Sequence, residues 1–256
     1  MTVVVTIMRK ELQDHLRDVR SLVSATLLAV LGPTVVLLVS LSGQAGGSSR
    51  GGVLLGMLSV FALVSAFAGA NDLAMDVTAG ERERRSLLPL LLTSVSTRQV
   101  VVGKWSAVAT VALAILGVNV VASAAVLSTA APSVLVSRGG QLGTWVVFGL
   151  VPLSFFGAAM SVLVALLCRT TKEASTALRM LVFAPMVSGM FLVFFPAWAD
   201  RLWFVPVFGQ QALVALADPA TVLIRGSILA VLTAAGTMGA LMGAVSALGR
   251  ADVLSA

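Results

Sequence analysis

An unbroken run of charged residues lies between two long apolar stretches of this chain, and it is the strongest candidate for chemistry in the sequence. The run consists of Glu81, Arg82, Glu83, Arg84 and Arg85, with Ser86 at its end. A leucine-rich segment, 87–95, follows it. Alternating acids and bases beside an amphipathic helix suit a specific docking surface for another protein. The plainer reading, a solvated loop followed by an interfacial helix, stays open from these residues alone.

The sequence offers few candidate catalytic residues. The sequence holds no G-x-x-x-x-G-K-[ST] motif, so it is not predicted to bind ATP through a P-loop. It has one histidine, His15, and one cysteine, Cys168, and no H-E-x-x-H motif, so no metal site is predicted. An intramembrane serine protease needs a histidine or lysine base beside its serine, and none stands within an apolar run. We therefore expect a chain that is not an enzyme and has no catalytic residue.

Polar residues inside the apolar runs are sparse. Asp72 and Asp76 stand near the inner end of the second run and are candidates for a cytoplasmic gate. The centres of the runs carry no charge, which argues against a secondary transporter driven by protons or sodium. Asn119, in the third run, is read either as an interhelical hydrogen-bond partner or as a substrate-path residue.

The elements that carry these residues are membrane spans. Hydrophobic residues make up 58% of the 256 residues and charged residues 11%, against about 25% charged in a soluble domain. A helix needs roughly 20 apolar residues to cross the hydrocarbon layer, and barrel-like alternation is not visible. The sequence thus predicts an all-α integral membrane protein that forms a single domain over 1–256. Its six predicted spans are 22–41, 53–75, 105–129, 142–168, 180–198 and 222–248.

The distribution of basic residues predicts the orientation. With the N-terminus in the cytoplasm, thirteen of the 17 Lys and Arg residues fall on cytoplasmic segments. The four outside are Arg50, Arg138, Arg201 and Arg225. This positive-inside bias places both termini in the cytoplasm. The formal net charge of +6 is therefore read as an orientation signal with contact to anionic lipid, and not as nucleic-acid binding.

Two further segments are predicted to touch the membrane without crossing it. Residues 1–21 form an amphipathic helix whose stripe, which includes Met8, Leu12 and Leu16, should lie on the membrane surface. Its charged residues, with Glu11 and His15 among them, should face solvent, although a lone histidine also permits a proton-sensing role.

The second such segment, 199–221, is too short and too interrupted to span, and is predicted to be re-entrant from outside. Its Gln210 and Gln211 should face protein or a water-filled cavity, and they are further substrate-path candidates. A short outer loop is expected at 130–141.

At this point the residues resemble a known family. The stretch 81–91, followed by Thr93-Ser94-Val95-Ser96 and Gly103-Lys104, is similar to a signature of type-two ATP-binding-cassette (ABC) permeases. That signature reads E-x-E-x-[GR]-[TS]-L-E-x-L-L, then [TS]-P-V-S and G-K. The opening stretch 9–18 resembles the branch that includes sodium-efflux permeases. Leu88 replaces a frequent Glu and Ser94 a frequent Pro, and the first outer loop lacks the large domain of many relatives in that branch.

The resemblance implies a membrane permease subunit of an ATP-driven ABC exporter in the cell (inner or plasma) membrane. It implies two cytoplasmic ABC ATPase subunits, which bind the ATP and magnesium, and a second permease subunit, identical or paralogous. Segment 76–104 would couple the ATPase to efflux. The alternative is a membrane scaffold or assembly factor that uses the same segment to recruit a partner without transport. Uncharged spans suit an amphipathic substrate such as a peptide, lipid or drug better than a bare ion.

Overall fold

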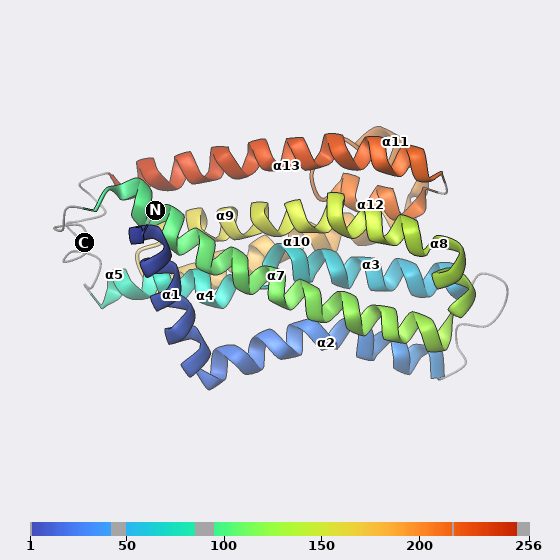
Figure 1. Cartoon of the computed structure of the whole chain (residues 1–256), viewed down its shortest axis with the longest axis horizontal. Coiled ribbons are helices and arrows are strands. Elements are labelled where there is room, and N and C mark those ends of the chain that lie inside the picture. Colours follow the sequence, from blue (N-terminus) through green and yellow to red (C-terminus); the bar gives the residue numbers. More distant parts are fainter. Residues whose placement is uncertain (1, 42–49, 85–94, 217, 250–256) are drawn as a thin grey trace.

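The computed structural model describes residues 2–41, 50–84, 95–216 and 218–249, and these form a bundle of long helices (Figure 1). Within those ranges six helical segments are long and apolar enough to cross a membrane, and no strand occurs. The predicted all-α, six-span fold is therefore confirmed. The segments are 22–41, 51–83, 97–130, 132–167, 171–192 and 219–248.

The first two helices meet at a steep angle at one end of the bundle, which we call the α1 end (Figure 1). Helix α1 (Thr2–Arg17) crosses this end, and α2 (Val19–Leu41) runs along the bundle. The face of α1 that is buried contains Ile7, Glu11 and His15, which are 5–8% exposed, whereas Leu16 is 64% exposed. The prediction that Glu11 and His15 face solvent is wrong, because α1 packs on α7 through this face.

The second membrane segment is a helix that changes its winding. Helix α3 (Arg50–Ala68) ends at a turn, and α4 (Asn71–Met75), the π-helix η1 (Asp76–Gly80) and α5 (Glu81–Glu83) continue it. A π-turn takes up an extra residue and so rotates the side chains that follow it. The first three residues of the charged run, Glu81–Glu83, are thus still helical and form the end of this segment.

The third and fourth segments are longer than the sequence predicts. Helix α7 (Thr97–Ala130) begins eight residues before the predicted boundary. Helix α8 (Pro132–Trp145) occupies the predicted outer loop at 130–141, so that prediction is wrong. Proline fits the first turn of a helix, and one non-helical residue, Ala131, suffices to turn the chain. The π-helix η2 (Val146–Leu150) and α9 (Val151–Leu167) complete the fourth segment.

The last part of the chain contains a short buried helix between two long ones. Helix α10 (Thr171–Phe194) is followed by the 3-10 helix η3 (Pro196–Trp198), α11 (Ala199–Leu202), α12 (Phe208–Ala215) and α13 (Pro219–Leu248). At 1.5 Å per residue, the eight residues of α12 extend only about 12 Å, too short to span a membrane. Helix α12 packs against α3, α10 and α13, and Gln210 and Gln211 are buried, which confirms that they face protein.

Candidate functional site

A buried lysine gathers carboxylates at the α1 end. Lys104 Nζ donates hydrogen bonds to Glu81 Oε2 at 2.6 Å, to the Val77 carbonyl oxygen at 2.6 Å and to Glu11 Oε1 at 3.4 Å. Its side chain is 1% exposed, against 7% for Glu11 and 13% for Glu81. At the rim, Lys10 Nζ lies 3.4 Å from Glu81 Oε1. We call Lys10, Glu11, Glu81 and Lys104 the Lys104 cluster. It joins α1, α5 and α7.

Local sequence explains how this cluster forms. The Ser96 hydroxyl oxygen accepts a hydrogen bond from the backbone N–H of Gln99, and the Gln99 side-chain oxygen accepts one from the backbone N–H of Ser96. This capping box starts α7. Lys104 therefore lies about two turns inside the helix. The preceding residue, Gly103, permits the approach of α1, because a Cβ atom there would lie 2.8 Å from a methyl of Ile7. The Gly-Lys pair thus combines a close helix contact with a buried charge.

Burial and neighbouring charge act differently on the two members of the cluster on α1. Burial raises the pKa of the Glu11 carboxyl, and the Lys104 ammonium opposes that rise. Burial would lower the pKa of Lys10, but the carboxylates of Glu11 and Glu81 outweigh it, so this pKa is raised. Glu81 is the carboxylate closest to Lys104, at 2.6 Å against 3.4 Å for Glu11.

The next two residues of the charged run contact the junction between α9 and α10. Arg82 Nη1 donates a hydrogen bond to the Cys168 carbonyl oxygen at 2.6 Å. Glu83 Oε2 accepts hydrogen bonds from the backbone N–H of Thr171 at 3.1 Å and from its hydroxyl at 2.7 Å. Thr171 is the first residue of α10, where a carboxylate also meets the positive end of the helix dipole. The charged run is thus attached to α10 as well as to α1 and α7.

The remainder of the run is more exposed. Arg84 Nη2 lies 3.1 Å from Asp76 Oδ1, and the two side chains are 71% and 56% exposed. Arg85 and Ser86 lie outside the described residues. Binding of an ATPase by this run remains a prediction, since the contacts seen here are all within the chain. Sequence reasoning recognised the run but missed its internal partners, which lie up to 88 residues away.

The three substrate-path candidates lie on two helices, Asn119 on α7 and the two glutamines on α12, and each has a partner in the chain. Asn119 Nδ2 donates to the Ala29 carbonyl oxygen at 2.9 Å, which confirms the interhelical reading. The Gln210 side chain accepts from the backbone N–H that precedes α12, and Gln211 Nε2 donates to Ser59 Oγ at 2.9 Å. One amide atom of each candidate is buried without a partner among the described residues. A role in a substrate path remains a prediction.

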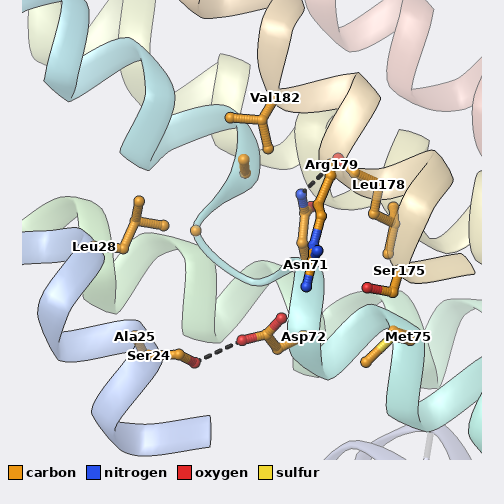
Figure 2. A pocket seen from close by; sticks show the side chains of 12 residues that line it. Ser24, Ala25, Leu28, Asn71, Asp72, Met75, Ser175, Leu178, Arg179 and Val182 are labelled. Atoms are coloured by element: carbon orange, nitrogen blue, oxygen red, sulfur yellow. Dashed lines mark hydrogen bonds between the residues drawn. The ribbon is translucent and has the colours of Figure 1, made fainter. Parts of the chain in front are cut away.

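A cavity of about 250 Å³ lies between α2, α10 and the turn that links α3 to α4 (Figure 2). Its apolar walls include Leu28, Met75 and Val182. Its polar lining residues are Ser24, Asn71, Asp72, Ser175 and Arg179. The cavity therefore combines apolar walls with charges of both signs.

Hydrogen bonds fix part of this polar lining. Ser24 Oγ donates to Asp72 Oδ2 at 2.6 Å, which joins α2 to α4 (Figure 2). Asn71 accepts from Ser161 Oγ at 2.7 Å and donates to the Leu178 carbonyl oxygen at 3.4 Å. Of the residues that line this cavity, only Asp72 was a candidate from the sequence. The polar Asn71 beside it was a signal that could have added a second lining residue. A gating role for Asp72 and Asp76 remains a prediction.

Comparison with known proteins adds two matches. Residues 5–202 match the family described as "ABC-2 family transporter protein". The chain is also 34% identical, over 197 residues, to the "ABC transporter permease protein NatB" of Bacillus subtilis (strain 168). This similarity covers 71% of the chain and 50% of NatB, so the chain spans about half the length of that relative.

Proposed function

Since this chain belongs to the ABC-2 family of transporter permeases, we propose that it couples a separate ATPase subunit to export of a substrate across the membrane. The family is a transmembrane component of ABC transporters, and the six apolar helices make the chain a multi-pass membrane protein. Two ATPase subunits would bind the ATP and magnesium. A second permease subunit, identical or paralogous, would complete the complex.

The observation that carries the coupling role is the attachment of the charged run to three separate elements. Glu81 holds α7 and α1 through the Lys104 cluster, while Arg82 and Glu83 hold the start of α10. A displacement of residues 81–84 would therefore move several helices together. Helix α4, which continues through η1 into the charged run, and α10 both form walls of the cavity. A push from an ATPase would thus reach a space able to hold substrate.

The proposed orientation follows from the basic residues. Both termini and the charged run would face the cytoplasm, where an ATPase has access to ATP. Helix α1 would lie in the membrane interface, because it crosses the bundle at a steep angle and leaves Leu16 exposed (Figure 1). Helix α12 would then lie at the outer side as a re-entrant segment.

The double variant Glu83→Ala/Arg84→Ala tests coupling. Both side chains are exposed, so their contacts contribute little to folding and the variant should insert normally. We expect ATP hydrolysis without transport, or loss of the bound ATPase, in vesicles containing the purified complex. The readouts are co-purification of the ATPase, ATP hydrolysis, and efflux of Na⁺ and of a fluorescent amphiphile. Arg138→Ala, at the opposite end of the bundle, is the control.

The results of these assays distinguish a coupling role for these two side chains from none, and an exporter from a membrane scaffold. Wild-type transport by the double variant, with its ATPase still bound, would show that these two side chains do not couple the subunits. If the wild-type chain binds an ATPase but neither moves a substrate nor responds to one, it acts as a membrane scaffold and the exporter proposal fails.

A further inference from the structure

The cavity between α2, α4 and α10 carries two opposite charges that do not pair with each other. Asp72 reaches it from α4 and Arg179 from α10 (Figure 2). The hydrogen bond to Asp72 comes from Ser24 and reaches only one carboxylate oxygen. No described residue forms an ion pair with Arg179 within 4.0 Å. The cavity thus presents a carboxylate and a guanidinium that a ligand can engage.

The remaining walls suit the start of an apolar chain. Leu28 and Ala25 come from α2, Met75 from α4, and Leu178 and Val182 from α10. Ligand pockets for drug-sized molecules measure about 300–1,000 Å³, so a cavity of about 250 Å³ holds a polar headgroup and little more. The rest of a larger ligand must therefore extend outside.

The two helices that flank the cavity expose apolar side chains. Leu27 and Leu31 on α2 are 60% and 53% exposed, and Phe183 and Met186 on α10 are 53% and 44% exposed. Helices α2 and α10 both pack against α3, and both contribute lining residues to the cavity. These exposed apolar side chains are as apolar as lipid tails, so an apolar chain leaving the cavity alongside them would enter a compatible environment.

We propose that this cavity binds the zwitterionic headgroup of an amphiphile. The ammonium group lies at the carboxylate of Asp72, the anionic group lies at the guanidinium of Arg179, and the apolar chain passes out between α2 and α10. As a site for cargo, this inference rests on the proposed function. As a binding site, it stands on the two charges and the apolar walls.

The position of the two charges explains how a headgroup would affect the ATPase. Asp72 is in α4, which continues through η1 into the charged run. Arg179 lies two turns after the start of α10, to which Glu83 is hydrogen-bonded at Thr171. A ligand that bridges Asp72 and Arg179 therefore fixes the relative position of the two elements that the charged run joins.

Binding of three single-chain amphiphiles to the purified full-length permease in nanodiscs tests the site. The probes are lysophosphatidylethanolamine, which is zwitterionic, lysophosphatidylglycerol, which is anionic, and dodecyltrimethylammonium, which is cationic. We expect the wild type to prefer the zwitterion. Asp72→Asn and Arg179→Gln should each weaken its binding about tenfold, which corresponds to losing one charged contact worth about 1.4 kcal/mol.

The two variants should also shift the preference in opposite directions. Asp72→Asn should favour the anionic probe relative to the cationic one, and Arg179→Gln should do the reverse. Because this is a ratio within one variant, it does not depend on how much protein folds. Lys172→Gln is the matched control, since it removes a positive charge from α10 outside this cavity. Equal wild-type affinity for the three probes, or an unchanged preference in both variants, would overturn the inference.

A second arm distinguishes cargo from a resident lipid. In the complex with the ATPase, a cargo headgroup should stimulate ATP hydrolysis, and Asp72→Asn should raise the concentration needed for half of the effect. Binding without stimulation would overturn the assignment as cargo and identify a lipid site. Absence of transport by a complex that still binds the zwitterion would count against the proposed function and not against the site.

Discussion

Replacing Lys104 with methionine is expected to destabilise the protein strongly, because it removes the only positive charge buried with two carboxylates in the described α1 end. Methionine has a similar length and is apolar, so the change removes the charge without opening a large cavity. Glu81 and Glu11 would keep their positions but lose their shared donor, as would the Val77 carbonyl oxygen.

The size of the effect follows from burial. At 2.6 Å and an effective dielectric constant of about 20, attraction between the Lys104 and Glu81 charges is roughly 6 kcal/mol, before the cost of removing both from water. Breaking a buried pair by removing one partner costs about 3–5 kcal/mol, because the other charge stays buried and unpaired. Each kcal/mol lowers the unfolding midpoint of a chain of this size by about 2–4 °C, so a fall of roughly 6–20 °C is expected.

Thermal unfolding of the detergent-solubilised protein, followed by tryptophan fluorescence, measures this shift. Lys10→Met is the matched control, since Lys10 pairs with the same Glu81 but is 61% exposed, and a surface pair contributes only about 0–1 kcal/mol. The double variant Lys104→Met/Glu81→Met should recover most of the loss, because an apolar pair replaces the buried charges. If Lys104→Met costs no more than Lys10→Met, or the double variant is no more stable than the single one, the reasoning is refuted.

Three further outcomes are expected. Burial raises the pKa of the Glu11 carboxyl, so the folded state keeps a proton there that the unfolded state loses. The free energy of unfolding should therefore fall as pH rises from about 4.3 through the folded pKa, and Glu11→Gln should make that fall shallower. Equal slopes for the two proteins would contradict this reasoning. Gly157→Ala would put a Cβ atom 2.2 Å from a backbone oxygen of α3 and should cost about 1–3 kcal/mol or more in thermal unfolding, whereas Gly139→Ala, which meets open space, should not. In intact cells an impermeant maleimide should label Ser137→Cys but not Arg98→Cys, and the reverse pattern would invert the proposed topology.

The sequence by itself determined the fold class and the region of interest. Six apolar runs of membrane length leave few alternatives to a helical bundle, because a backbone in hydrocarbon must satisfy its own hydrogen bonds. A run of alternating charges in such a chain is conspicuous, and its spacing, with the Gly-Lys pair that follows, resembles the family that the comparisons establish. Burial of Gln210 and Gln211 could also be foreseen, because amides are costly against lipid.

Tertiary structure alone decided which charges are buried and what they contact. Periodicity assigned Glu11 to the solvent side of the first helix, and the charge of Lys104 placed the start of the predicted third span at 105. Both residues are buried, because Glu11 meets Lys104 from 93 residues away and Lys104 also meets Glu81 and the Val77 carbonyl oxygen. Asp72 and Arg179, 107 positions apart, likewise share one cavity only because α4 and α10 meet. A hydropathy pattern records the cost of burying a charge, but the compensating contact exists only after distant helices have packed together.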